Sequence, residues 1–526
     1  PRCSHSFYLH STTADEVCQV ITSLKTTSAG LNHIDPCKVK LISHEILSIL
    51  ALIINKLFLA GVFPSCLKAG RIVPVFKKGD QTSVGNYRPI CIVPFFGKVI
   101  EKLFHTRLMR YLMKFNLLSP QQFGFRKGYS TELALISLTE ETKQAIDRGL
   151  SVGCVFINLT RAFDTINHRI LLVKLESFGI SGPPLNFIKD YLSNRSQMVQ
   201  VNGHLSSSKL INVGVPQGSI LGPLLFLMFI NDLPTILAKT KCILYADDTT
   251  ILTSSKAIAT LQSNLNTDLN NITLWCQNNH LHIIPTKTTF MVFYSPRILI
   301  NVPPSVNIGD HVIHVSNEAR FLGVILDTEL KFYGHTRSLV KKIAFGIHII
   351  IKTRTYFPPH IVRSLYFAYI HSHLSYCVSS WANTYFTHIE RLQRLQNQAM
   401  RLMTFTPFES SCRSLFPKLN ILPLRQLFRQ KLSIITYRLI TYDIIIECID
   451  PEHITNNNST RFSQRNNLLL PAVRTNYGKF TALFSGIAIW NSLPLETKSS
   501  HNVHTFSART KKYFIQELTD SSEFSN

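Results

Sequence analysis

The chain has 526 residues, enough for roughly two to four compact domains around a large buried core. It carries 55 Lys and Arg against 31 Asp and Glu, and this formal charge of +24 indicates a polyanionic partner, with nucleic acid favoured over an anionic membrane surface. Because 45% of the residues are hydrophobic, the composition excludes a disordered basic tail.

The cysteines and the apolar runs indicate where the protein works. The 11 cysteines form no Cys-x-x-Cys pair, which favours free thiols in a reducing compartment over a disulfide scaffold or a zinc ribbon. Two loose Cys/His groups, at 276–282 and 371–377, lack the paired spacing of a zinc site. No signal peptide opens the chain, and the longest apolar runs are shorter than the ~20 residues of a membrane span. We therefore expect an intracellular protein, nuclear or cytoplasmic, with no membrane partner.

The first 70 residues predict helices. Thr13 with Glu16 is typical of a capped helix start, and residues 44–60 have apolar positions at helical spacing that end at Gly61. We expect residues 1–70 to form a helical N-terminal extension.

Two extended runs follow, at 71–76 and 86–90, with basic residues near their ends. Lys77, Lys78 and Arg88 suit the binding of a triphosphate or a backbone phosphate, although a solvated basic turn explains them equally well.

Helices are then predicted over 96–115 and 130–147, with a glycine-rich segment between them. Residues 121–128 place glycines among aromatic and basic groups, a pattern that suits close backbone approach to a flat or anionic partner. A buried strand is predicted to begin at Gly153, and the loop 214–219 precedes an apolar helix over 221–230.

The strongest chemical signal is the run from Ile243 to Leu252, in which two β-prone segments flank Asp247 and Asp248. Adjacent carboxylates repel each other, and a plain hairpin does not offset that repulsion, whereas a divalent cation does. Carboxylates at the end of a buried sheet that hold Mg²⁺ are the usual arrangement for nucleotidyl transfer. A solvated turn is the alternative for this pair when it is considered alone.

The second half of the chain changes from mixed to helical. A helix is predicted over 257–278, and strands over 290–294 and 321–327, so the fold class is α+β. From Arg337 to Arg438 there are fifteen Lys and Arg and two acidic residues. Within 391–402 one apolar stripe is predicted to pack while the adjacent face meets phosphate, or else remains solvated; the stripe is Leu392, Leu395, Ala399 and Leu402, and the face is Arg391, Arg394 and Arg401.

These blocks, in this order, resemble the reverse transcriptase of non-LTR (LINE-type) retrotransposons, most like the jockey-related branch. The motifs that carry the resemblance are Phe76-Lys77-Lys78-Gly79-Asp80, Asn86-Tyr87-Arg88-Pro89-Ile90, Gln122-Phe123-Gly124-Phe125-Arg126, Ala162-Phe163-Asp164, Gly214-Val215-Pro216-Gln217-Gly218-Ser219, Tyr245-Ala246-Asp247-Asp248 and Phe321-Leu322-Gly323-Val324. The resemblance implies a right-hand polymerase, with fingers and palm over 71–335, a mainly helical basic thumb over 336–440 and a C-terminal region over 441–526. The family's N-terminal endonuclease is not represented in this sequence.

The resemblance also implies partners and residue roles. The partners are an RNA template, a DNA primer, deoxynucleoside triphosphates and an endonuclease domain from outside this chain. Two Mg²⁺ ions are expected, with Asp247 and Asp248 as ligands. The remaining assignments are Lys77, Arg88, Phe163, Gln217 and Gly218 for the nucleotide, Lys287 for the leaving pyrophosphate, and Arg126, Leu322 and Gly323 for nucleic acid.

One catalytic position departs from the family. Where the family has a third carboxylate, in Asp-Leu-x-Lys-Ala-Phe-Asp, this chain has Asn158. An amide brings no negative charge, so we expect an impaired polymerase. Ile284 is a second departure, at a position where the family usually has Asn. The alternative function is a catalytically dead protein that retains the fold as a nucleic-acid binder; an unrelated basic nuclease or ligase is disfavoured.

Overall fold

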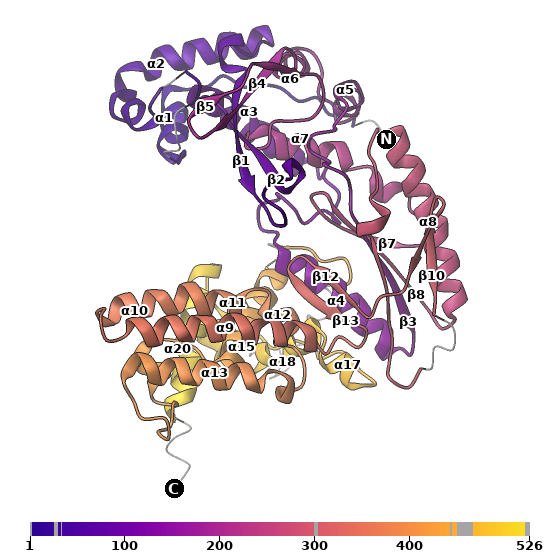
Figure 1. Ribbon diagram of the computed structural model, residues 1–526, viewed down its shortest axis with the longest axis vertical. Helices are drawn as coiled ribbons and strands as arrows, with labels where there is room; N and C mark the ends of the chain where they lie inside the picture. The colour runs from indigo at the N-terminus through magenta and orange to yellow at the C-terminus, as the bar shows by residue number, and fades with distance from the viewer. Residues whose placement is uncertain are drawn as a thin grey trace.

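The computed structural model describes residues 3–25, 30–32, 34–298, 303–441, 444–449 and 466–520. The ribbon follows a C, with the N-terminal half in the upper arm and the back, and residues beyond about 330 in the lower arm (Figure 1). Parts of the expected C-terminal region, 450–465 and 521–526, lie outside the described residues.

Two helices open the upper arm, α1 (Ala14–Ser23) and α2 (Pro36–Ala60). The prediction for the start of α1 is confirmed, because the Thr13 side chain accepts a hydrogen bond from the Glu16 N–H. The predicted end of α2 is also confirmed, since Gly61 has a φ of 67° and ends the helix in the left-handed region.

The fingers contain a sheet of order β2-β1-β4-β5, with β6 paired to β4. The two predicted strands are β1 (Ala69–Phe76) and β2 (Tyr87–Ile92), and they are antiparallel. Sequence reasoning missed β4 (Arg195–Val201), which is mostly partly buried, and also β5 (His204–Leu205) and β6 (Lys209–Ile211), which are short and largely exposed. The supporting helices are α3 (Phe95–Lys114), α5 (His168–Ser177) and α6 (Pro183–Leu192).

The palm is an antiparallel sheet of order β7-β8-β3-β9. Its strands are Lys241–Tyr245, Asp248–Ser255, Ser151–Ile157 and Thr289–Phe293 in that order. Helices α4 (Thr131–Asp147), α7 (Leu221–Ile230) and α8 (Ile258–Asn278) belong to the same region. Every residue of β3 is buried, so this strand is the centre on which the site is built.

Two hairpins follow the palm: β10 (Ser305–Ile308) with β11 (His311–His314), and β12 (Glu318–Phe321) with β13 (Val324–Asp327). The prediction of a single strand over 321–327 is wrong. Leu322 and Gly323 have φ values of 44° and 87° and turn the chain back, because two successive left-handed residues make the turn that suits a two-residue hairpin.

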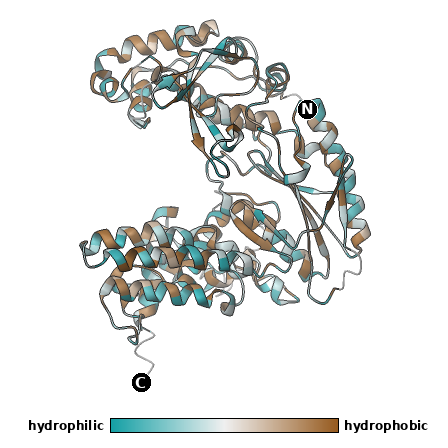
Figure 2. Ribbon diagram, viewed as in Figure 1, coloured by the Kyte–Doolittle hydropathy of each residue, from teal (hydrophilic) through white to brown (hydrophobic). Residues whose placement is uncertain are grey.

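The lower arm contains the segment expected to form the thumb, in which α9 (Tyr333–Thr353) and α13 (Phe386–Thr404) run side by side in the same direction. Tyr333 hydrogen-bonds His388 at one end, and Arg354 hydrogen-bonds the Leu402 carbonyl at the other. Hydrophobic and hydrophilic residues alternate along these helices (Figure 2). The other helices are α10 (Pro359–Tyr366), the π-helix Phe367–His371, α11 (Ser372–Ser375), α12 (Val378–Trp381), α14 (Leu415–Leu419) and α15 (Leu424–Ile440).

The predicted apolar stripe of α13 is confirmed. Leu392 and Ala399 are buried in the core, and Leu395 and Leu402 are partly buried and pack against it. Gln396 is also buried on this helix, and its amide donates to Tyr366 and to the Leu422 carbonyl. A polar residue was not expected in the core, but its hydrogen bonds satisfy it.

The C-terminal segment packs back onto palm helix α4. It contains α17 (Asn476–Lys479), α18 (Ala482–Ser492), α19 (Leu495–Lys498) and α20 (Val503–Asp520). Buried Glu140 accepts the N–H groups of Ala482 and Leu483, so its charge lies at the start of α18. Asp147 accepts the N–H groups of Arg474 and Thr475 in the same way, ahead of α17.

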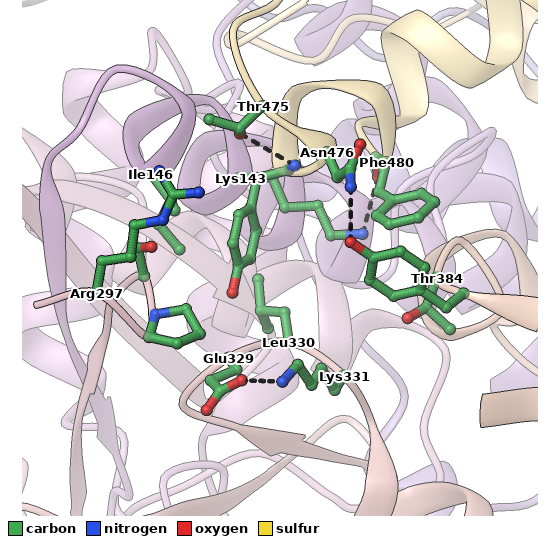
Figure 3. Close-up of a pocket in the computed structure, with 14 residues that line it drawn as sticks. Lys143, Ile146, Arg297, Glu329, Leu330, Lys331, Thr384, Thr475, Asn476 and Phe480 are labelled. Carbon is green, nitrogen blue, oxygen red and sulfur yellow. Dashed lines mark hydrogen bonds and ion pairs between the residues drawn. The ribbon is translucent and has the colours of Figure 1, made fainter. Parts of the chain in front are cut away.

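A cavity of about 330 Å³ lies where the C-terminal segment meets the palm and the thumb (Figure 3). Lys143 reaches its wall from α4 and donates to the carbonyls of Asn383 and Phe480. None of the predicted site residues lines this cavity.

Two further predictions concern the chain's environment. All 11 cysteines are free. Within the described ranges no single helix has the length and apolarity to cross a membrane, although a bent pair, 36–42 with 44–60, meets both criteria together.

Candidate functional site

The predicted carboxylates lie at the tip of the β7–β8 hairpin. Tyr245 pairs with Asp248, so Ala246 and Asp247 form a two-residue turn between the strands. Ala246 has a φ of 56°, a left-handed conformation that costs free energy in a non-glycine residue. This left-handed conformation makes the tight turn that brings Asp247 and Asp248 together at the tip of the hairpin.

Residues 121–124 hold this turn in place. Gln121 and Phe123 bond the backbone of Leu244, and the buried side-chain oxygen of Gln122 accepts the N–H of Ala246 at 3.0 Å. A Cβ on Gly124 would lie 2.5 Å from the Ala246 nitrogen. Gly124 therefore lets its loop lie directly against the Ala246 turn. The sequence had suggested that the glycines here allow a flat or anionic partner to approach the backbone.

Asn158 follows the last residue of the central strand β3. Ile157 pairs with Thr249, so the next step of the same register sets Asn158 opposite Asp248, on the same face of the sheet. The Asn158 side-chain N–H donates to the Lys287 backbone carbonyl at 3.0 Å, and the backbone carbonyl of Asn158 accepts from the Ile284 N–H. The amide thus anchors the loop that carries Lys287, whose side chain is exposed.

Basic residues of the fingers face the carboxylates. The charges of Lys77 and Arg88 pull the pKa of Asp247 down, but desolvation by the surrounding protein raises it more. Desolvation and the neighbouring charge of Asp247 together raise the pKa of Asp248 to about 6, although its side chain remains exposed to solvent. Two neighbouring carboxylates with two cations close enough to affect them are an arrangement that suits a divalent ion and a polyphosphate.

The donor set fits Mg²⁺ only in part. Asp247 and Asp248 supply hard, crowded carboxylate oxygens, which is what Mg²⁺ takes from protein. The described residues contain no group of three or more His, Cys, Asp or Glu that could hold a metal. The third position is an amide already engaged with a backbone carbonyl, so these residues fit one ion and lack the anion needed to bridge a second.

The loop 214–219 is fixed against both the fingers and the palm. The Gln217 side chain donates to Asp164 at 2.8 Å, and its carbonyl accepts from Cys91 of β2. Gly218 has a φ of 117°, and a Cβ there would lie 2.4 Å from the Cys91 carbonyl oxygen. Sequence reasoning missed Glu101, a fully buried carboxylate that accepts the N–H groups of Ile220 and Leu221 and so anchors the start of α7.

Phe163 lies beside this loop with one ring face covered. It stacks on Phe226 with ring centroids 4.3 Å apart, and its carbonyl accepts from Val215. The side chain is only partly buried, which leaves part of the ring accessible.

Three other predicted contacts lie around the palm. Arg126 donates to the carbonyls of Ser119 and Gln122 and stacks over Tyr129. Leu322 and Gly323 form the tip of the β12–β13 hairpin, where the Leu322 carbonyl accepts from the Tyr376 hydroxyl. Their contact with nucleic acid stays a prediction.

The arginines of α13 differ among themselves. Arg394 pairs with Glu390, and Arg401 donates to the Ser410 carbonyl and stacks over Phe408, whereas Arg391 is exposed. Arg391 and Arg394 are both exposed and Arg401 is partly buried, and the contact of this face with phosphate stays a prediction.

Comparison with known proteins finds similarity to reverse transcriptases. A model described as "Reverse transcriptase (RNA-dependent DNA polymerase)" matches residues 75–326. The "Probable RNA-directed DNA polymerase from transposon BS" of Drosophila melanogaster is 29% identical over 77% of this chain and 46% of its own length. The "RNA-directed DNA polymerase from mobile element jockey" of the same species is 28% identical over 79% of this chain and 46% of its length. The chain thus spans less than half the length of these relatives.

Among solved structures, apo telomerase from Candida tropicalis, truncated from its C-terminal domain, shares 13% identity with a TM-score of 0.34, over 51% of this chain and 55% of that one. A likeness this low supports no argument about the site.

Proposed function

Because residues 75–326 of this chain belong to the reverse transcriptase family, we propose that it is the RNA-directed DNA polymerase of a non-LTR retrotransposon. Its substrates in this proposal are an RNA template, a DNA primer and deoxynucleoside triphosphates, and it works inside the cell, in the nucleus or the cytoplasm. The observation that carries the proposal is the Asp247–Asp248 turn, crowded enough to raise the pKa of Asp248 to about 6 and faced by Lys77.

The reaction joins the primer 3′-hydroxyl to the α-phosphate of the nucleotide and releases pyrophosphate. Mg²⁺ held by Asp247 and Asp248 supplies charge stabilisation of the phosphate oxygens when it is bound. Lys77 and Arg88 bind the triphosphate through their charge, and their distance from the aspartates is short enough to affect the pKa of Asp247. Lys287, which is exposed just before the start of β9, donates a proton to the leaving pyrophosphate.

The remaining residues position the reactants. Phe163, supported by Phe226, lies against the sugar and excludes a 2′-hydroxyl. Gln217 and Gly218 place the template and the incoming base, because their loop is bonded to both β2 and Asp164. The hairpin tip at Leu322 and Gly323 and the exposed Arg391 contact the primer–template.

A second candidate is a nucleic-acid binder without turnover. The Asn158 side chain donates to the Lys287 carbonyl. A carboxylate at this position would be repelled by that oxygen and would turn toward a cation. A protein that lacks the third carboxylate loses on the order of a thousandfold or more in rate, and retains the fold and the phosphate contacts.

Primer extension on a poly(rA)–oligo(dT) template with Mg²⁺ tests the proposal. The parent protein, Asn158→Asp and Asn158→Asp with Asp248→Asn form the matched set. Extension by Asn158→Asp that disappears in the double variant supports a polymerase. Binding of primer–template without extension by any of the three supports the second candidate.

A further inference from the structure

One aromatic residue near the catalytic turn has no assigned role. Phe125 is 54% exposed, unusually open for a phenylalanine. Its φ of 53° is the left-handed conformation, which a bulky residue adopts only where surrounding contacts enforce it. An exposed aromatic ring on a strained backbone is typical of a functional position rather than a packing position.

The neighbouring residues explain how that backbone is enforced. Gln122 accepts the N–H groups of Gly124 and Ala246, at 2.8 and 3.0 Å, and so joins the loop to the catalytic turn. A Cβ on Gly124 would also lie 3.1 Å from the Tyr245 carbonyl carbon, so the loop is in direct contact with the turn. Phe125, the next residue, is therefore held at a set place beside Asp247 and Asp248.

The ring of Phe125 meets the ring of Phe163. Their centroids are 6.2 Å apart at an interplanar angle of 84°, an edge-to-face contact. Phe163 is already stacked on Phe226 of α7, at 4.3 Å and 27°. The ring of Phe163 thus contacts the buried ring of Phe226 on one side and the half-exposed ring of Phe125 on the other. Both contacts fix its position.

We propose that Phe125 is a second aromatic wall of the pocket for the sugar of the incoming nucleotide, and that it sets the preference for deoxynucleotides together with Phe163. The inference rests on the proposed function, in which Phe163 excludes the 2′-hydroxyl. Phe125 acts by limiting the space into which Phe163 can move and by packing against the sugar through its own open face. Because Gln122 in the Phe125 loop is hydrogen-bonded to Ala246, the distance between the Phe125 ring and the two aspartates is fixed.

The test is equilibrium binding of a matched deoxynucleoside or ribonucleoside triphosphate to the protein–primer–template complex. Ca²⁺ replaces Mg²⁺ so that binding is measured without transfer, and both the parent and the Asn158→Asp background are used. Phe125→Ala should lower the ratio of deoxy to ribo affinity about threefold to tenfold, the range expected for one aromatic pair. Phe125→Leu, which retains bulk without the ring, should recover part of the ratio.

Two further variants separate the possible failures. Phe357→Ala removes a ring of similar exposure, 49%, just beyond the C-terminal end of α9. This variant should leave the ratio of deoxy to ribo affinity unchanged. If Phe163→Ala lowers the ratio and Phe125→Ala does not, this inference is wrong and the proposed function stands. If neither background binds a matched nucleotide, the proposed function is wrong and the inference falls with it.

Discussion

The palm and the thumb place their charged side chains in opposite ways. In the palm, desolvation raises the pKa of both Asp247 and Asp248, and the charge of Asp247 raises the pKa of Asp248 further, although Lys77 opposes both shifts. In the thumb helix α13, Arg394 and Arg401 are already engaged with Glu390 and with the Ser410 carbonyl. Keeping Asp247 and Asp248 ionised therefore costs free energy, as is typical of functional sites, whereas Arg401 has a backbone acceptor and Arg394 has a solvent-exposed ion pair.

The same contrast exists within the palm, between the two strand ends that meet at the site. The β7–β8 turn carries two anions and a strained Ala246, whereas the end of β3 carries a neutral amide bonded to the Lys287 carbonyl. The β7–β8 turn suits the binding of a cation, whereas Asn158 at the end of β3 holds a neighbouring loop in place.

The largest effect is expected from Asn158→Asp. Restoring the carboxylate should raise the single-turnover rate of primer extension by about a thousandfold or more, because it adds charge stabilisation in the transition state. Primer–template affinity should change little, since the residue lies at the metal site rather than on the nucleic-acid surface. Asn158→Ala should extend no faster than the parent. Equal rates for the parent and the Asp variant would show that this carboxylate is not required.

Nucleic-acid binding should depend steeply on salt. With a formal charge of +24 and several phosphate contacts, affinity for primer–template should fall by about a thousandfold between roughly 50 and 200 mM NaCl. Fluorescence anisotropy across that range measures the slope. A slope near zero would contradict a basic nucleic-acid surface and leave the excess charge unexplained.

Extension by Asn158→Asp should decline at acidic pH. The pKa of Asp248 is raised to about 6, so protonation below that pH removes the charge that binds the cation, and the rate should fall up to about tenfold per pH unit. The direction follows from a raised carboxyl pKa: the charged form dominates above it and is lost as pH falls through it. Because Asp247 and Asp248 titrate as a pair, the profile reports the pair. Higher Mg²⁺ should move the decline to lower pH; a midpoint unaffected by Mg²⁺ would contradict this origin.

The smallest effects should separate two arginines of α13. Arg391→Ala should weaken primer–template binding severalfold and reduce the salt slope by about one, as for a single phosphate contact. Arg401→Ala should instead lower the free energy of unfolding by about 1 kcal/mol, because its guanidinium bonds the Ser410 carbonyl and stacks over Phe408. Anisotropy and thermal denaturation of both variants provide the comparison. Equal binding losses would contradict the division between an exposed and an engaged arginine.

Local patterns predicted the elements whose signals lie within a few consecutive residues. The helix over 221–230 was predicted with its observed bounds, since its run of apolar residues ends in polar ones on both sides. The Asp247–Asp248 hairpin was equally readable, because two β-prone runs flank the pair. The match to the reverse transcriptase family over 75–326 confirms the resemblance built on these motifs.

The errors occurred where a distant segment decides the outcome. Residues 195–211 form strands because β4 pairs with β1, more than a hundred residues earlier, and not because their own pattern is strong. The pattern of residues 321–327 predicts one strand, since Gly323 alone does not reveal that Leu322 also adopts a left-handed conformation.

By itself, the sequence determined the resemblance to reverse transcriptases, the α+β class, the adjacent carboxylates and the absence of a third one at position 158, because each is a matter of residue identity or short-range spacing. Only the tertiary structure decided what those residues contact. Gln122 supports the Ala246 turn across more than a hundred residues, Asn158 bonds the loop of Lys287, and Phe125 meets Phe163. Such contacts arise when separate strands and loops pack into one sheet edge, and no local periodicity records which distant partner each side chain will meet.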